Sequence, residues 1–221
     1  MFDQGRHFIN EEFHADAVTP AQIDTLLADG WRHFGTRFFR YNLAVYKNEI
    51  RRVMPLRIRL ADFRLSKSQR RVLRRNADLD VSIGRFDVTP ETHEIFERHK
   101  RRFKSGVPNS IYDFIARDAE SSPTELFEIT VRNDGKLAAA SFFDLAERSV
   151  SAIYGCFDPD ETARSLGIFT MLKVIEYATE LGFEFYYQGY AYEGESFYDY
   201  KKRFSGIESY DWNGIWTKYT G

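Results

Sequence analysis

The sequence predicts an α+β fold in which helices cover both faces of a mixed β-sheet. Three strand patterns follow one another between residues 124 and 157, and the first two are joined by the turn sequence Asn133-Asp134-Gly135. A helical pattern, ETARSLGIFTMLKVIEYATELG, comes directly after the third strand, and a further strand pattern, FEFYYQGYAY, comes after that helix. The 221 residues are 43% hydrophobic, so the chain can bury a sizeable core.

The first elements of the chain predict a small N-terminal lobe. Residues 19–30 read as a helix, because Thr19 can cap its start and a proline follows in the first turn. In WRHFGTRFFRY, ring and polar residues alternate around Gly35, which indicates a hairpin. VMPLRIRL then predicts a strand with aliphatic side chains on one face and Arg57 and Arg59 on the other.

Helices and strands alternate in the middle of the chain. SKSQRRVLRRN predicts a helix that Ser66 caps and that closes near Asn76. DLDVSIGRF predicts a strand, TPETHEIFERHKRRF a helix, and NSIYDFIARDAE a shorter helix. No internal repeat and no low-complexity linker interrupts this pattern.

The order of the later elements narrows the fold class. Three antiparallel strands, a helix entering just after the third, and then a further strand are the order expected of the GCN5-related N-acyltransferase core, a mixed sheet with helices on both faces. The sequence therefore predicts two parts. Residues 1–75 form a small N-terminal α/β lobe with a basic segment, and residues 76–221 form an acyltransferase-like domain.

Cysteine content and hydropathy exclude several classes of protein. The lone Cys156 cannot form an internal disulfide, and a four-thiolate metal site cannot be built. The five histidines lack the spacing of metal ligands, and no Gly-x-Ser-x-Gly elbow of a hydrolase is present. No apolar run reaches 18 residues, and no signal-peptide pattern opens the chain. We therefore expect a cytoplasmic protein with no membrane partner, no metal site and no cofactor.

The formal net charge is −2, but basic residues concentrate in one segment. Between Arg51 and Arg75, ten basic residues stand against a single acid, Asp62, so this segment is about +9 and the rest of the chain about −11. Helical spacing spreads five of them over one helix: Lys67, Arg70, Arg71, Arg74 and Arg75. Such a surface is typical of a protein that binds a polyanion such as nucleic acid. A solvated helix paired with acids elsewhere gives the same pattern.

Two further segments carry candidate binding residues. In DPDETARSLGIF, Arg164 and Gly167 match the first half of the Arg-x-x-Gly-x-Gly/Ala loop with which acyl-CoA-dependent acyltransferases bind pyrophosphate. Phe169 replaces the last small residue and disfavours coenzyme A, and a helix start with one packing glycine fits equally well. FEFYYQGYAYEGESFYDYKKRF places six tyrosines around Gln188-Gly189, which indicates a lined pocket, although core rings with satisfied hydroxyls explain single tyrosines.

Five segments carry a resemblance to a known family. They are LLADGWRHFG, PLRIRLADFRLSKSQRRVLRRNADLDV, DPDETARSLGIFTMLKVIEYATELG, YYQGYAYEG and YKKRF. Together, from about residue 20 to about residue 210, they resemble the arginyl-tRNA-protein transferases and their bacterial leucyl-transferring relatives. The resemblance implies a GCN5-related fold, an aminoacyl-tRNA as donor, and the N-terminal amine of an acceptor protein or peptide as acceptor.

Two features depart from the family pattern. The family has closely spaced cysteines just before its Pro-x-Arg-Ile strand, whereas this chain has RYNLAVYKNEIRRVM there, so we expect no metal cluster. Phe197-Tyr198 stand where the family has Lys-Met. The chain therefore looks like a compact branch that has kept the chemistry and changed its substrate.

The resemblance lets us assign roles. We predict that Gln188 and Tyr190 are catalytic and orient the amine and the ester carbonyl. The predicted substrate-binding residues are Tyr154, Asp158, Arg164, Tyr200, Lys201 and Arg203. Of these, Lys201 and Arg203 receive the acceptor's carboxylate or the tRNA end. The five basic side chains of the helix over 66–76 bind the tRNA backbone. The ester is already activated and an α-amine has a pKa of about 7.7–8.0, so a catalytic histidine is not required.

Two other functions stay open at this point. One is an acyl-CoA-dependent N-acyltransferase on the same fold, which binding of coenzyme A would favour. The other is a non-catalytic tRNA-binding protein, which equal binding of charged and uncharged tRNA without turnover would favour.

Overall fold

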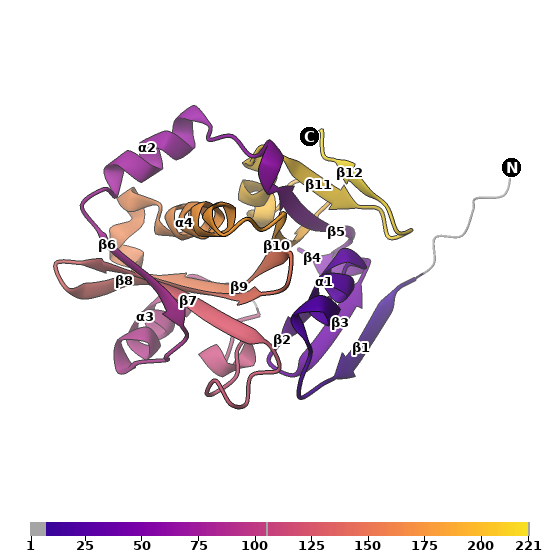
Figure 1. Ribbon diagram of the computed structural model, residues 1–221, viewed down its shortest axis with the longest axis horizontal. Helices are drawn as coiled ribbons and strands as arrows, with labels where there is room; N and C mark the ends of the chain where they lie inside the picture. Colours follow the sequence, from indigo (N-terminus) through magenta and orange to yellow (C-terminus); the bar gives the residue numbers. More distant parts are fainter. Residues whose placement is uncertain (1–7, 105, 221) are drawn as a thin grey trace, which may run out of the picture.

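A computed structural model describes residues 8–104 and 106–220, and this part of the chain forms two β-sheets (Figure 1). The smaller sheet has the strand order β1-β3-β2. The larger sheet has nine strands in the order β12-β11-β5-β10-β9-β8-β7-β6, with β4 paired to β5. Its mixed character comes from β10, which runs parallel to β9 and antiparallel to β5.

The bounds of the strands and helices are as follows. The strands are β1 (Asn10–His14), β2 (Arg32–Phe34), β3 (Arg37–Tyr41), β4 (Leu43–Tyr46), β5 (Glu49–Arg59), β6 (Asp80–Arg85), β7 (Glu125–Asn133), β8 (Lys136–Leu145), β9 (Ser149–Phe157), β10 (Phe185–Tyr192), β11 (Ile207–Tyr210) and β12 (Trp216–Lys218). The α-helices are α1 (Pro20–Ala28), α2 (Lys67–Arg75), α3 (Pro90–Lys100) and α4 (Leu166–Glu180). Short 3-10 turns cover Leu60–Asp62, Ile111–Asp113, Pro159–Arg164 and Phe197–Arg203.

Helices cover both faces of the larger sheet, as the sequence predicts. Helix α4 buries Leu172 and Ile175 against sheet residues such as Ile129 and Val150, and α2 packs outside α4 (Figure 1). On the opposite face, α3 buries Phe96 in a second cluster with Phe142 of β8 and with Ile111. Alternation along the strands sends successive side chains to these two cores. The α+β class with a mixed sheet is therefore confirmed.

Most predicted elements are confirmed because local signals agree with the tertiary packing. Thr19 and Ser66 both form capping boxes at the starts of α1 and α2. The hairpin around Gly35 forms β2 and β3, and β7, β8 and β9 are consecutive antiparallel neighbours. The sequence did not predict β1, β4, β11 or β12, which are short or lie at sheet edges where hydrophobic alternation is weak.

Two predicted helices differ from the structure. NSIYDFIARDAE forms only the 3-10 turn Ile111–Asp113 rather than a helix. Its later part bends instead, because the Asp118 carboxylate accepts a hydrogen bond from the backbone of Ser121. The predicted helix from Glu161 begins as α4 only at Leu166, since Ser165 has a left-handed backbone with φ of 55° and the preceding residues form a 3-10 turn.

Strand β5 lies in the middle of the larger sheet. It pairs with β10 on one side and with β11 on the other, so residues 53–59 pair with strands from the last part of the chain. Helix α1 and the smaller sheet have their own core around Phe38, which also includes Tyr187 of β10. The division of the chain at residue 75 stays a prediction.

The helices can be compared with the length and hydrophobicity that a membrane-spanning helix needs. In residues 8–104 and 106–220, no helix is both long enough and apolar enough to cross a bilayer. None of the described His, Cys, Asp and Glu side chains gather in a group of three or more that could hold a metal ion.

The contact of α3 with the sheet predicts a pH-dependent stability. His99 is buried, and its Nδ1 accepts a hydrogen bond from the backbone N–H of Phe157 at 3.3 Å. Burial lowers the pKa of His99 to about 4 from a usual 6.5. Between these values the unfolded chain binds a proton that the folded chain does not, so stability falls as the pH drops.

The expected loss from His99 between pH 7 and pH 5 is about 2 kcal/mol. Urea unfolding at both pH values measures it, and His99→Gln, which keeps an acceptor for Phe157, should remove this part of the loss. An equal fall in wild type and variant would contradict the assignment.

Candidate functional site

Strands β9 and β10 part soon after they meet. Their parallel pairing covers only Phe185–Tyr187 against Ser149–Ser151. Next, the register of β10 against β5 shifts between Tyr187 and Gly189, so that Gln188 forms a bulge. Gly189 has φ of 85°, in the left-handed region. Where two parallel strands separate, their backbone groups no longer pair with each other. The predicted catalytic residues Gln188 and Tyr190 lie at this point of β10.

Gln188 carries an amide that lacks partners. The residue is only 3% exposed, and neither Oε1 nor Nε2 has a hydrogen bond with any described residue. A buried amide left without partners costs about 1–3 kcal/mol. Such a group is stabilised when a bound molecule supplies the missing donor and acceptor, so Gln188 has the chemistry to orient an amine and a carbonyl.

Two basic side chains, Arg32 and Lys201, lie beside this bulge. A methyl group placed on Gly189 would lie 3.4 Å from Lys201 Nζ and 3.6 Å from Arg32 Nε. Arg32 is buried and donates to Ser151 Oγ at 2.7 Å and to the carbonyl of Ala152. Burial lowers the pKa of Arg32, although a guanidinium stays protonated in proteins. Neither side chain forms an ion pair with a described carboxylate, so the guanidinium of Arg32 gives the site a positive charge.

Lys201 joins the 3-10 turn Phe197–Arg203 to β10. Its Nζ donates to the carbonyl of Tyr190 at 3.0 Å and lies 5.2 Å from the ring centre of Tyr198. Burial first, and the nearby Arg32 second, lower the pKa of Lys201 to about 7. The amine therefore has a large neutral fraction at physiological pH.

The tyrosines of the site remain protonated. The phenol of Tyr190 donates to the carbonyl of Gly30 at 2.6 Å, and its ring packs on Tyr41. Burial raises the pKa of Tyr41 and of Tyr200 to about 12, and it raises the pKa of Tyr186 as well. These side chains can donate hydrogen bonds but cannot accept a proton.

The structure brings four predicted residues together: Gln188, Tyr190, Tyr200 and Lys201. Tyr190 and Lys201 are in direct contact, Gln188 lies between them and the paired part of β10, and Tyr200 neighbours Lys201 on the same turn. Arg203 ends that turn with an exposed side chain.

Two predicted substrate-binding residues are engaged on the α3 side of the sheet. Tyr154 stacks on Phe114 at 4.1 Å and contacts Phe96, and its buried hydroxyl has no partner among the described residues. The Asp158 carboxylate pairs with Arg98 at 2.6 Å and caps the turn Pro159–Arg164. These contacts show that Tyr154 and Asp158 contribute to the packing of this side of the sheet, which the sequence did not indicate.

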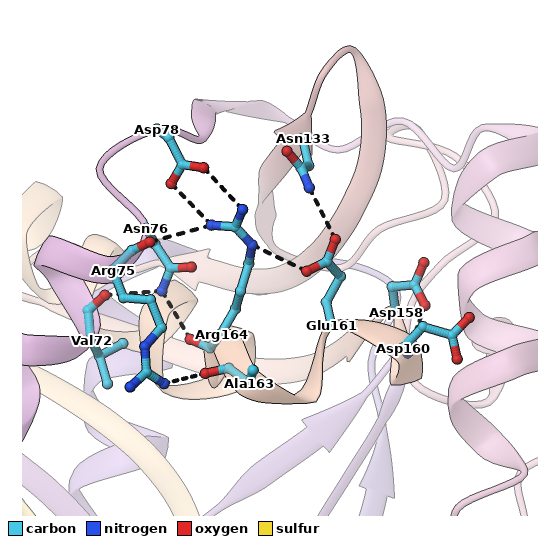
Figure 2. Close-up of polar contacts among 10 residues, drawn as sticks. All are labelled: Val72, Arg75, Asn76, Asp78, Asn133, Asp158, Asp160, Glu161, Ala163 and Arg164. Carbon is cyan, nitrogen blue, oxygen red and sulfur yellow. Dashed lines mark hydrogen bonds and ion pairs between the residues drawn. The ribbon is translucent and has the colours of Figure 1, made fainter.

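Arg164 is held by two acids (Figure 2). It binds both oxygens of Asp78 at 2.9 Å and Glu161 at 3.1 Å. Its backbone carbonyl accepts from the Asn76 amide, and Arg75 donates to the carbonyl of Ala163. These contacts hold α2 against the start of α4. Phe169 lies in the main core, so the loop also lacks the small residue that close pyrophosphate binding needs.

Apart from Arg64, which donates to the carbonyls of Ala61 and Phe63, the basic residues of the segment form two groups. The arginines of β5 are paired with acids: Arg57 and Arg59 with Glu208, Arg51 with Glu49, and Arg52 with Glu193. On α2, by contrast, Lys67, Arg71 and Arg74 are exposed and form no ion pair with described residues, while Arg70 and Arg75 bond backbone carbonyls. The sequence left open a solvated helix paired with acids, but the ion pairs involve the arginines of β5, and α2 keeps an open basic surface.

The sequence did not single out Arg32. Trp31-Arg32-His33 looks like any strand of a hairpin, and the residue lies far from Ser151 and Lys201 along the chain. Only the packing of β2 against the larger sheet makes it part of the site.

Gly189 is expected to be sensitive to substitution. Gly189→Ala should destabilise the protein by about 1–2 kcal/mol, because φ of 85° is unfavourable for any residue with a Cβ atom. The new methyl group also contacts Lys201 Nζ and Arg32, so activity should fall more than stability. Urea unfolding and the transfer rate measure the two effects. Gly135→Ala, which is also left-handed but has open space around it, is the control; equal losses of activity in both variants would contradict the prediction.

Comparisons with known proteins bear on what this site does. A family model described as arginine-tRNA-protein transferase, C terminus, matches residues 91–211. An aspartate/glutamate leucyltransferase of Stenotrophomonas maltophilia is 32% identical over 195 residues, which cover 84% of this chain and 75% of that protein. A protein of the same name from Acinetobacter baumannii is 29% identical over 205 residues, covering 91% of this chain and 73% of that protein.

Two solved structures have a similar fold. FemX is 13% identical with a TM-score of 0.51, and the match covers 91% of this chain and 72% of that one. The C-terminal domain of a protein assigned as a lysylphosphatidylglycerol synthetase from Agrobacterium fabrum is 17% identical with a TM-score of 0.50, covering 84% and 55%. At these identities the comparison shows a shared fold alone.

Proposed function

Because the chain belongs to the arginine-tRNA-protein transferase family, and is therefore an aminoacyl-tRNA-dependent transferase, we propose that it moves leucine from leucyl-tRNA to the N-terminal amine of a protein or peptide. The observation that carries the choice of leucine is the 32% identity with a protein named aspartate/glutamate leucyltransferase over 84% of this chain. The same name favours acceptors that begin with Asp or Glu. Arginine is the other donor amino acid that the family description supports.

We also propose that the fold is the GCN5-related N-acyltransferase core. The element order supports this: three antiparallel strands, a helix that begins just after β9, and β10 running parallel to β9 before the two strands separate. The match to FemX at a TM-score of 0.51 supports the same general architecture.

The proposed chemistry needs positioning more than covalent catalysis. The ester of an aminoacyl-tRNA is already activated, so the enzyme must hold both reactants and stabilise the oxyanion that forms. In this proposal, the free amide of Gln188 orients the reacting groups, and buried Arg32 stabilises negative charge beside it. Tyr190 acts through its backbone carbonyl, which holds Lys201, because its phenol is bonded to Gly30.

The remaining assignments follow from the same proposal. We propose that the exposed basic face of α2 binds the tRNA backbone and that Arg203 and Tyr200, on the turn Phe197–Arg203, bind the acceptor or the tRNA end. The transfer would give the acceptor a new N-terminal residue, the kind of change that creates an N-degron. The proposed location is the cytoplasm, where charged tRNA is made. Residues 1–75 and 76–221 are the proposed lobes.

A transfer assay tests the function. The purified chain is incubated with leucyl-, arginyl- and other aminoacyl-tRNAs and with peptides that begin with Asp, Glu or Ala, and mass spectrometry reads the mass added. We expect leucine on the Asp and Glu peptides and none on N-acetylated versions. If no combination of aminoacyl-tRNA and peptide gives transfer, the proposal is wrong for these acceptors. A thermal-shift scan with coenzyme A tests the acyl-CoA alternative, for which no shift is expected.

A further inference from the structure

Transfer to an amine needs a group that accepts a proton, and neither predicted catalytic residue can be that group. Gln188 is an amide, which does not ionise at physiological pH. The phenol of Tyr190 donates to Gly30, and burial raises its pKa further. Another side chain near the bulge of β10 is therefore the place to look for a proton acceptor of suitable pKa.

Lys201 has the position for this task. Its Nζ lies next to Gly189, the residue after Gln188, at the point where β9 and β10 part. The amine uses one N–H to bond the carbonyl of Tyr190 at 3.0 Å. A neutral amine that donates in this way still has its lone pair free. The backbone contact thus fixes Nζ without blocking its use as a base.

The charges around Lys201 favour the neutral amine. From β2, Arg32 presents a buried cation. From β10 and from its own turn, Lys201 meets a carbonyl and the ring of Tyr198, which carry no negative charge. No described acid forms an ion pair with Lys201. Asp199 on the same turn pairs with Lys202, and Asp144, which acts on Arg32, contacts His33. Burial and Arg32 together lower the pKa of Lys201 to about 7, near the optimum for a general base at neutral pH.

We propose that the Nζ amine of Lys201 is the general base that takes the proton from the acceptor amine during transfer, with Arg32 as the positioning residue beside it. This inference rests on the proposed function and adds a catalytic residue to it. Lys201 thereby differs from a residue that binds a carboxylate, because such a role needs the protonated form.

The step balances in atoms and charge. The acceptor nitrogen attacks the ester carbonyl carbon, and an N–C bond forms while the carbonyl oxygen becomes an oxyanion. Lys201 Nζ accepts the proton that the nitrogen loses and becomes an ammonium. When the intermediate collapses, the bond from carbon to the ribose oxygen breaks, and the ammonium returns its proton to that oxygen. An amide and a free tRNA hydroxyl result, and Lys201 is neutral again.

The pH profile of kcat/KM for the acceptor peptide tests this, at saturating aminoacyl-tRNA. Two groups must lose a proton in the wild type: Lys201, and the acceptor amine with a pKa of about 7.7–8.0. As the pH falls below both pKa values, log(kcat/KM) should fall with a limiting slope of about 2. Lys201→Met should leave a slope of about 1 and lower kcat/KM at pH 8 by about 10²–10⁴-fold.

Two further variants distinguish a role of Lys201 as a base from a role as a fixed positive charge. Lys201→Arg keeps the cation but cannot be neutral, so it should be as inactive as Lys201→Met. The control is Lys202→Met on the same turn, whose side chain pairs with Asp199 and should leave the slope of 2 intact. A slope of 2 in Lys201→Met, or near-normal activity in Lys201→Arg, would overturn the proposal.

A readout independent of transfer separates this inference from the proposed function. NMR of protein labelled with [ε-13C]lysine follows each amine, and the signal missing from Lys201→Met identifies Lys201. We expect it to titrate near pH 7 and to move to higher pH in Arg32→Gln. Titration near the ordinary value of about 10.4 would overturn the base assignment even if the enzyme transfers amino acids. Titration near 7 in a protein that fails every transfer assay would instead count against the proposed function.

Discussion

Asp144→Ala is expected to lower the free energy of unfolding by about 3–5 kcal/mol, because it removes a buried carboxylate and leaves its hydrogen-bond partners His33 and Thr124 unsatisfied. Asp144 is fully buried on β8 and lies 2.7 Å from Nε2 of His33 on β2. Its other oxygen accepts from Thr124 Oγ1 at 2.7 Å. Nδ1 of His33 donates to the carbonyl of Gly35, so the imidazole is held on both sides.

The hydrogen bond between His33 and Asp144 connects the two sheets. His33 belongs to the three-stranded sheet and Asp144 to the nine-stranded sheet, and Arg32 is the neighbour of His33. The substitution should therefore loosen the strand that carries Arg32 and reduce transfer activity as well as stability.

Urea unfolding measures the Asp144→Ala effect, and thermal unfolding should show a fall in Tm of roughly 6–20 °C for a chain of this size. Glu184→Gln is the matched control, because it removes an ion pair with Arg148 that lies exposed on the surface and should change the midpoint little. A similar small change in both variants would show that the His33–Asp144 pair adds little to stability.

Removing three charges from α2 should weaken tRNA binding by roughly 10²–10³-fold at about 0.1 M salt. Lys67, Arg71 and Arg74 are exposed and form no ion pair among the residues described, so their charges are available to phosphates. Each phosphate contact contributes about 0.7–0.9 to the slope of log affinity against log salt. The triple variant Lys67→Gln, Arg71→Gln, Arg74→Gln should thus lower the magnitude of that slope by about 2–3.

Filter binding or fluorescence anisotropy over a range of salt concentrations measures this slope. Arg37→Gln, Arg148→Gln is the control, since both arginines are exposed but bound to Glu12 and Glu184. Circular dichroism checks that α2 still forms, which its capping box from Ser66 and Gln69 favours. An unchanged slope in the triple variant would place the tRNA on another surface.

The sequence by itself determined most of the elements, because their signals are local. Thr19, Ser66 and Thr89 cap helices through side chains only three residues from their partners. The turn at Asp134-Gly135 and the alternation on either side specify the β7–β8 hairpin. Where a long-range contact competes, local signals fail: Ser165 breaks the predicted helix at the point where Arg164 is held by Asp78 and Glu161.

The candidate site was predicted only in part, for the same reason. Gln188 and Lys201 were visible because they belong to one continuous polar and aromatic segment near the C-terminus. Counting charges along the sequence revealed the basic segment, but it could not show which of its arginines are paired with acids. The pairing of Arg57 and Arg59 with Glu208 spans about 150 residues of chain.

Tertiary structure alone decided the chemistry of the site. The pKa of Lys201 depends on burial and on Arg32, which the sequence separates from it by most of the chain. The free amide of Gln188 depends on where β9 and β10 part. Sequence patterns report periodicity and capping within a few residues, whereas desolvation and charge–charge interactions depend on which distant segments fold against each other.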